Sequence, residues 1–101
     1  REGPQASIRP TGIAASSLGA STIGGRAMAQ MAECDVRSIL VSDADIRAAQ
    51  QQLWEDVRLL VEPGAATALA ALTSGAYVPE AGERVGVVVC GGNAAPDWFL
   101  D

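Results

Sequence analysis

The 101-residue chain has a net charge of -5, from 12 acidic residues and seven arginines, and 49% of its residues are hydrophobic. This acidity argues against a nucleic-acid partner, because proteins bind the phosphate backbone through clustered positive charge. Its apolar runs fall short of the roughly 20 residues that cross a bilayer, and no signal-type leader is visible. The sequence therefore predicts no nucleic-acid partner and no membrane association, and its length suits one small domain or a piece of a larger one.

Histidine and lysine are both absent from the sequence. Without histidine the chain cannot by itself build a Ser-His or Cys-His nucleophile pair, and without lysine it cannot hold a carbonyl cofactor covalently. The two cysteines, Cys34 and Cys90, are too few for a disulfide framework, so we expect a reducing, cytoplasmic compartment. They are also a poor basis for a metal cluster, and we predict no metal site.

The first part of the chain predicts a loop, a helix and a strand, in that order. Residues 1–12 contain two prolines and two glycines and are typical of a loop. In residues 21–32 apolar side chains recur at helical spacing, and Ser21 or Thr22 is placed to cap the helix. Residues 36–41, VRSILV, form a short apolar run with β-branched residues and predict a strand.

The strongest predicted helix follows this strand. Ser42 and Asp45 have the spacing of a capping box, in which each side chain binds the backbone N–H of the other residue. Apolar residues then recur three or four apart at Ile46, Ala49, Leu53, Val57 and Leu60. We expect the helix to end near Glu62, because the residue before a proline is pushed out of helical geometry.

The last part of the chain predicts a further helix and a further strand. Residues 65–73 are almost all small and apolar, which indicates a largely buried helix, and Gly75 is placed to end it. Residues 85–90, VGVVVC, lack polar alternation, which is typical of a strand covered on both faces in a parallel sheet. Helices and strands in this order predict an α/β fold. Because two strands leave open sheet edges, we expect the chain to be part of something larger.

The sequence CGGN at residues 90–93 follows the predicted last strand and leaves three interpretations of Cys90. In open α/β sheets, ligands bind beyond the carboxyl ends of the strands, and glycines let the backbone approach them closely. An ordinary tight turn after a core strand is the alternative. A reactive thiol is disfavoured, because the chain has no histidine or lysine to activate it.

Glu62 is the second candidate, since it is a charged residue between two apolar helical segments and directly precedes Pro-Gly. A carboxylate at such a kink either takes part in a site or caps the following helix, near whose N-terminus negative charge is favourable. The local pattern leaves both interpretations open.

Three segments, taken together and in this order, resemble the threonine and serine dehydratases, which are pyridoxal-phosphate enzymes of fold type II. They are GIAASSLGASTIG at 12–24, LWEDVRLLVEPGAATALAAL at 53–72 and GERVGVVVCGGN at 82–93. The resemblance covers residues 10–96. It implies a partial three-layer α/β domain with a parallel sheet, in which residues 1–101 form one partial domain from the C-terminal portion of the large cofactor domain.

The resemblance also implies roles for four residues. Cys90 falls on the Ser or Cys that hydrogen-bonds the pyridine nitrogen of the cofactor. Gly91 and Gly92 would let the chain approach the ring, and Glu62 would organise the same side of the pocket. A neutral group at the ring nitrogen favours β-elimination over transamination. The implied reaction removes water from a small hydroxy-amino acid to give a 2-oxo acid and ammonia, in an enzyme that is expected to be a homo-oligomer.

The chain departs from the family pattern at two points, and only the first bears on what it can do. The lysine that holds the cofactor, the substrate loop and the phosphate-binding glycines lie upstream of the matched segments, and Ser16 stands where relatives often have an acidic residue. We therefore expect the 101-residue chain to be inactive alone. The alternatives are a serine racemase-like or other fold type II pyridoxal-phosphate enzyme, and a non-catalytic structural or interaction module.

Overall fold

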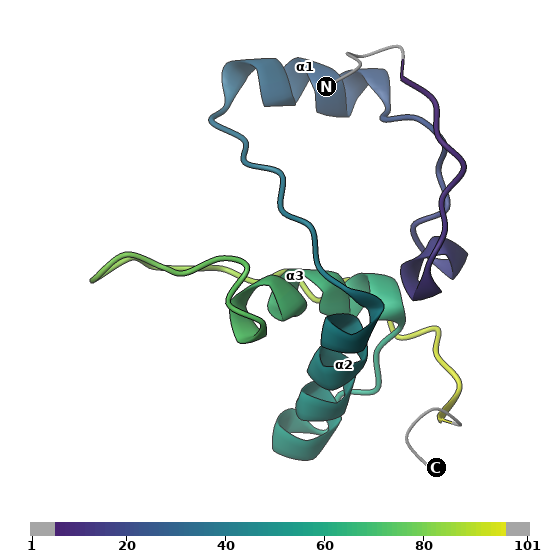
Figure 1. Ribbon diagram of the computed structural model, residues 1–101, viewed down its shortest axis with the longest axis vertical. Helices are drawn as coiled ribbons and strands as arrows, with labels where there is room; N and C mark the ends of the chain where they lie inside the picture. Colours follow the sequence, from purple (N-terminus) through teal and green to yellow (C-terminus); the bar gives the residue numbers. More distant parts are fainter. Residues whose placement is uncertain (1–5, 97–101) are drawn as a thin grey trace.

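A computed structural model describes residues 6–96 of the chain. Its regular structure is helical, and no strand occurs within that range. The elements are η1 (Ile13–Ser16, a 3-10 turn), α1 (Gly25–Glu33), α2 (Asp43–Val57) and α3 (Pro63–Thr73) (Figure 1). No helix among the described residues is long and apolar enough to cross a membrane.

The predicted α/β fold is wrong, because both predicted strands are extended chain without a pairing partner. Within the described range, no backbone N–H or C=O group of residues 36–41 or 85–90 takes part in a hydrogen bond. A β-strand is defined by hydrogen bonds to a neighbouring strand. The apolar, β-branched composition of these segments favours extended backbone, but it cannot supply the neighbour.

Helix α1 begins later than the sequence pattern indicates. Gly24 is its N-cap residue, with φ -64° and ψ 149°, and no side chain caps the helix. The prediction that Ser21 or Thr22 caps it is wrong, because the two glycines at this point have low helix propensity and delay the first turn. The helix contains no buried residue, and it stands apart from α2 and α3 beyond a length of extended chain (Figure 1).

Helix α2 begins as predicted. The Asp45 N–H donates to Ser42 Oγ at 3.1 Å, and Asp45 Oδ2 accepts hydrogen bonds from the Ser42 N–H at 3.2 Å and from Ser42 Oγ at 2.6 Å. The capping box is therefore confirmed. These bonds satisfy N–H groups that have no partner within the helix.

Helix α2 ends at Val57, earlier than the predicted end near Glu62. Arg58 adopts a left-handed backbone conformation with φ 58°. The Leu59 N–H then donates to the Leu53 carbonyl at 3.1 Å, and the Arg58 N–H donates to the Trp54 carbonyl at 3.0 Å. The left-handed residue and these two hydrogen bonds are typical of a helix C-terminus, and they turn the chain away from the helix axis.

Helix α3 has Pro63 in its first turn and ends at Thr73, so its predicted end is confirmed. Gly75, with φ 78°, donates its N–H to the Leu72 carbonyl at 3.1 Å just beyond the helix. A positive φ suits glycine, which has no Cβ to clash with the carbonyl.

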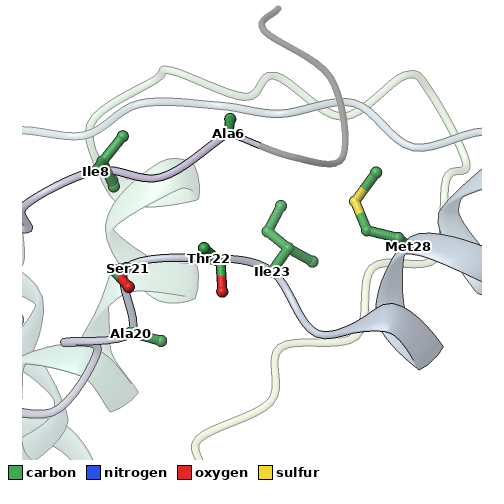
Figure 2. A pocket seen from close by; sticks show the side chains of 7 residues that line it. All are labelled: Ala6, Ile8, Ala20, Ser21, Thr22, Ile23 and Met28. Atoms are coloured by element: carbon green, nitrogen blue, oxygen red, sulfur yellow. The ribbon is translucent and has the colours of Figure 1, made fainter.

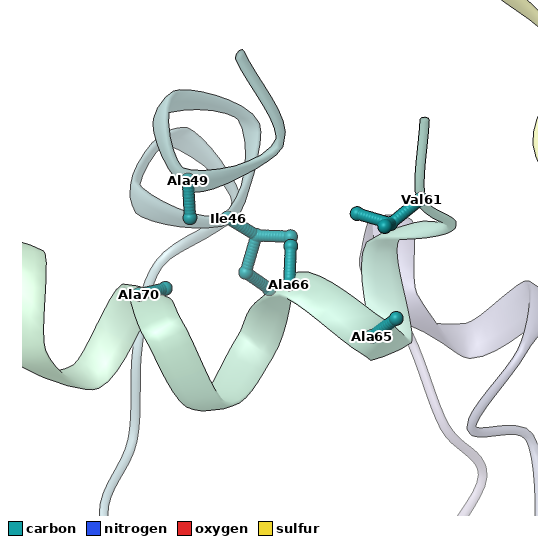
Figure 3. Close-up of a cluster of buried hydrophobic side chains, with 6 residues drawn as sticks. All are labelled: Ile46, Ala49, Val61, Ala65, Ala66 and Ala70. Atoms are coloured by element: carbon teal, nitrogen blue, oxygen red, sulfur yellow. The ribbon is translucent and has the colours of Figure 1, made fainter. Parts of the chain in front are cut away.

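The hydrophobic core lies between α2 and α3 (Figure 3). Six hydrophobic residues are buried there: Ile46, Ala49, Val61, Ala65, Ala66 and Ala70. Four of the six are alanines, and small side chains at a contact let two helices approach closely. The core is small, so much of the remaining apolar surface stays exposed.

Gln50 is the one polar side chain buried among the described residues, and it joins α2 to the chain that enters α3. Its Nε2 donates to the Val61 carbonyl at 2.8 Å, and its Oε1 accepts from the Arg47 guanidinium at 3.1 Å. Both ends of the buried amide are therefore satisfied, as buried polar groups require. The bond fixes the backbone directly before Glu62.

We expect the substitution Gln50→Leu to lower the free energy of unfolding by about 1–3 kcal/mol, because it keeps the side-chain volume but leaves the buried Val61 carbonyl without a donor. Urea denaturation followed by circular dichroism measures this loss. Gln51→Leu is the matched control, since Gln51 is exposed and bonds only Glu55 within the same helix, and it should change stability by less than about 0.5 kcal/mol. Equal losses from the two substitutions would contradict the role of the Gln50 amide.

The hydrogen bonds from the Ser42 hydroxyl and the Ser42 backbone N–H lower the pKa of Asp45 below its ordinary value of 3.8. A carboxylate with a lowered folded-state pKa stabilises the fold above its unfolded-state value and loses this effect as the pH falls through the folded-state value. The capping box should therefore weaken only in acid, below about pH 4.

A carbon-detected NMR titration of the Asp45 carboxyl group measures this pKa. Ser42→Ala removes the hydroxyl donor and should raise the pKa of Asp45, whereas Ser38→Ala, in the neighbouring extended segment, should leave it unchanged. A Ser42→Ala variant with an unaltered Asp45 titration would show that the Ser42 hydroxyl does not lower this pKa.

Candidate functional site

Glu62 and Gly91 lie in direct contact, although they are far apart in the sequence. The Glu62 N–H donates to the Gly91 carbonyl at 3.2 Å. A Cβ at position 91 would overlap Oε1 of Glu62 and lie 2.6 Å from its Cδ. The side chain of Glu62 therefore occupies the space that any larger residue at position 91 would need, and the contact brings the start of α3 to the CGGN segment.

The Glu62 carboxylate does not cap α3. Glu62 is the N-cap residue of the helix, but its side chain makes no capping hydrogen bond. Ser17 caps the helix instead, because its Oγ accepts a hydrogen bond from the Gly64 N–H at 3.0 Å. Of the two interpretations that the sequence leaves open for Glu62, capping is thus wrong, and the half-buried side chain is instead turned toward Gly91.

The η1 turn is fixed to the N-termini of both packed helices. Asp43, the first residue of α2, accepts a hydrogen bond from the Ile13 N–H at 3.2 Å. Gly12 has φ 88°, and a Cβ there would lie 2.9 Å from Asp43 Oδ1. Together with the Ser17 bond to α3, these contacts hold η1 beside the start of α3, where Glu62 lies.

Sequence reasoning misses Ser17 and Asp43 as positioning residues. Their hydrogen-bond partners are 47 and 30 residues away in the chain. Local patterns reveal caps only where donor and acceptor are a few residues apart. The segment 12–24 carries part of the family resemblance, but nothing in its spacing indicates which helix ends it contacts.

Cys90 and Gly92 flank the Glu62 contact. Cys90 is exposed and carries a free thiol. A Cβ at Gly92 would lie 3.5 Å from the Leu60 carbonyl, so the chain passes close to the backbone that leads into α3. The structure therefore brings Glu62 and the CGGN segment together at one place, with the thiol accessible to solvent.

The chemistry that this arrangement offers is limited. The Glu62 carboxylate makes no hydrogen bond or ion pair with any other residue that the structure describes. Nor do the described residues contain a group of three or more side chains that could hold a metal ion. The Glu62 carboxylate, the exposed Cys90 thiol and the two glycines can bind the polar edge of a planar ligand. They do not form a pair of a nucleophile and a base that activates it.

A separate cavity of about 300 Å³ lies near the start of α1 (Figure 2). Its lining is mostly apolar and consists of Ala6, Ile8, Ala20, Ser21, Thr22, Ile23 and Met28. The Ile8 N–H donates to the Ser21 carbonyl at 2.8 Å across it. None of the predicted site residues lines this cavity, and it holds no charged side chain.

We expect the substitution Gly91→Ala to displace the Glu62 side chain, because the new Cβ would overlap its carboxylate. The carboxylate is the end of a flexible side chain, so the cost in stability should stay below about 1 kcal/mol while the carboxyl group moves. The chemical shift of the Glu62 carboxyl carbon measures the displacement. Gly86→Ala is the control, since nothing lies within 4 Å of a Cβ at that position. An unchanged Glu62 signal in Gly91→Ala would contradict the contact.

Comparison with known proteins gives a partial match to a family of dehydratases. No protein-family model matches the chain. The human "Serine dehydratase-like" protein is 42% identical over 87 residues, which cover 78% of this chain and 26% of the relative. The "Phenylserine dehydratase" of Ralstonia pickettii is 47% identical over 63 residues, or 62% of this chain and 19% of the relative. The "L-serine dehydratase/L-threonine deaminase" of Bos taurus is 34% identical over 87 residues, or 78% of this chain and 27% of the relative. The resemblance predicted from the three segments is thereby confirmed.

Proposed function

We propose, on the premise that this chain is homologous to part of the serine and threonine dehydratases, that it forms one wall of a pyridoxal-phosphate site. The chain spans about a quarter of the length of the human relative. The activity that we propose for the whole protein is removal of water from a small hydroxy-amino acid, which gives a 2-oxo acid and ammonia. The observation that carries the proposal is the contact between Glu62 and Gly91, next to the exposed thiol of Cys90.

The residues at this contact fit one side of such a cofactor. Gly91 and Gly92 carry no side chain, and because the Glu62 carboxylate takes the space of a Cβ at Gly91, a planar ring would approach the backbone from a side that Glu62 leaves free. The Cys90 thiol is both a weak donor and a weak acceptor, which suits a ring nitrogen that is not held protonated. The Glu62 carboxylate is half-buried and has no partner among the described residues, so it is available to a bound group.

Each of these residues binds or orients; none of them is a base or nucleophile for the reaction. Cys90 would hold the ring nitrogen of a bound cofactor, while the backbone bond of Glu62 to Gly91 keeps the two segments together, so that Glu62 would orient the same side of the pocket. When bound, pyridoxal phosphate supplies the electron sink for elimination. The chain contains no lysine, so the residue that holds the cofactor covalently belongs to the rest of the dehydratase.

The proposal extends to the organisation of the whole protein. Residues 1–101 form one partial domain, the C-terminal portion of a larger cofactor-binding domain. The complete enzyme is cytoplasmic and a homo-oligomer. Its substrate is a small hydroxy-amino acid, and it has neither a nucleic acid nor a membrane as partner.

A chimaera tests the role of Cys90. The chain replaces the matched segment of the human serine dehydratase-like protein, and release of 2-oxo acid from L-serine and L-threonine is assayed. Cys90→Ala should lower kcat/KM by about tenfold or more, since loss of a hydrogen bond worth about 1.4 kcal/mol gives a factor of ten. Cys34→Ala is the matched control, because Cys34 is also a free, exposed thiol but lies elsewhere.

A second readout does not depend on activity. Pyridoxal phosphate should slow alkylation of Cys90 in the chimaera and leave alkylation of Cys34 unchanged. Equal protection of the two thiols, or equal activity of the two alanine variants, would overturn the assignment of Cys90. The isolated chain should release no 2-oxo acid, and release by the isolated chain would show that the site is complete without the rest of the enzyme.

A further inference from the structure

One backbone N–H group at the N-terminus of α3 has two side chains of this chain that can accept its hydrogen bond. In the structure the Gly64 N–H donates to Ser17 Oγ at 3.0 Å. Glu62 is the N-cap residue of the same helix, and an acceptor side chain at the N-cap normally binds the N–H of the second or third helical residue. Gly64 is the second residue of α3. The Ser17 hydroxyl therefore takes the place that the Glu62 carboxylate could take.

The absence of a side chain at Gly64 lets the chain around Ser17 come close enough for this bond. A Cβ at position 64 would lie 2.5 Å from Ser17 Oγ and 2.9 Å from Leu18 Cγ, and both distances are too short for atoms that are not bonded. Ser17 is half-buried, and its Oγ also donates to the Ala14 carbonyl at 3.4 Å. The hydroxyl thus acts as acceptor and donor at once, which fixes its orientation toward α3.

Loss of the Ser17 hydroxyl would leave the Gly64 N–H without its acceptor. Negative charge is favourable near a helix N-terminus, where the first N–H groups have no partner within the helix. The Glu62 carboxylate is placed to respond, because it begins the helix and makes no hydrogen bond or ion pair with any other residue that the structure describes. By turning to Gly64, the carboxylate would leave the space beside Gly91 that it now occupies.

We propose that Ser17 is a positioning residue of the proposed cofactor site. By capping α3, Ser17 keeps the Glu62 carboxylate beside Gly91, and without this cap the carboxylate turns to the helix and caps it instead. This rests on the proposed function, because Glu62 orients a cofactor only if the site binds one. It extends that function to the segment around η1, which acts on the site through the N-terminus of α3.

Nuclear magnetic resonance of the full 101-residue chain tests this exchange of caps without cofactor or activity. In Ser17→Ala, a scalar coupling across the new hydrogen bond should join the Gly64 nitrogen to the carboxyl carbon of Glu62, and the chemical shift of that carbon should change. Ser17→Thr keeps the hydroxyl, so its Glu62 signal should be that of the unaltered chain. Ser16→Ala is the matched control, because Ser16 is the neighbouring serine, is exposed, and its Oγ bonds only the Ile13 carbonyl within η1.

The chimaera with the human serine dehydratase-like protein measures the consequence for the reaction. Ser17→Ala should lower kcat/KM at least roughly tenfold, because a displaced pocket residue orients the reacting groups poorly. In a Glu62→Ala background the same substitution should cause no further loss, since Ser17 acts through Glu62. Ser16→Ala should leave kcat/KM unchanged in both backgrounds.

Two results would overturn the proposal. One is a Glu62 carboxyl signal that Ser17→Ala leaves unchanged, and the other is a loss of kcat/KM from Ser17→Ala that is equally large with and without Glu62. A different result bears on the proposed function alone. If the coupling between Gly64 and Glu62 appears in Ser17→Ala but the chimaera releases no 2-oxo acid from L-serine or L-threonine, the exchange of caps stands and the proposed function is contradicted.

Discussion

The hydrogen bond from Gln50 to the Val61 carbonyl is the constraint on which the rest of this structure depends. It lies in a core that consists mostly of alanines, where an unpaired amide or carbonyl would be costly. Because the side chain comes from the middle of α2 and its acceptor lies just before α3, the bond fixes how the chain returns after the left-handed turn at Arg58. Glu62 follows at once, and its backbone N–H holds Gly91. One buried amide thus positions the start of α3 and, through it, the CGGN segment.

The candidate site is assembled at the N-terminus of α3 from three separate parts of the chain. Ser17 caps the helix from the η1 segment, Glu62 begins it, and Gly91 packs against Glu62. Since Ser17 supplies the capping acceptor, the Glu62 carboxylate does not have to serve the helix, and it remains available next to Cys90. Because Ser17 caps α3, the side chain of Glu62 can face Gly91 instead of the helix backbone.

The small core and the exposed extended segments have a common physical origin. A helix pair held together by alanines and a few larger residues buries limited apolar area, and the radius of gyration of 14.7 Å exceeds the roughly 13 Å of a compact domain of this length. Valine side chains outside the helix pair, among them Val36, Val85 and Val88, therefore remain on the surface. This is consistent with a chain that spans about a quarter of the length of its human relative.

The sequence by itself determined the helices and their local signals. Ser42 and Asp45 predicted the capping box, and Gly75 predicted the end of α3, because these signals act between residues a few positions apart. It also determined the family resemblance, through the residue order of three segments. Only the tertiary structure decided that residues 36–41 and 85–90 are unpaired, since a strand requires a neighbour that no local pattern supplies. It likewise decided that Ser17, and not Glu62, caps α3, because that choice depends on a hydrogen bond between residues 47 positions apart.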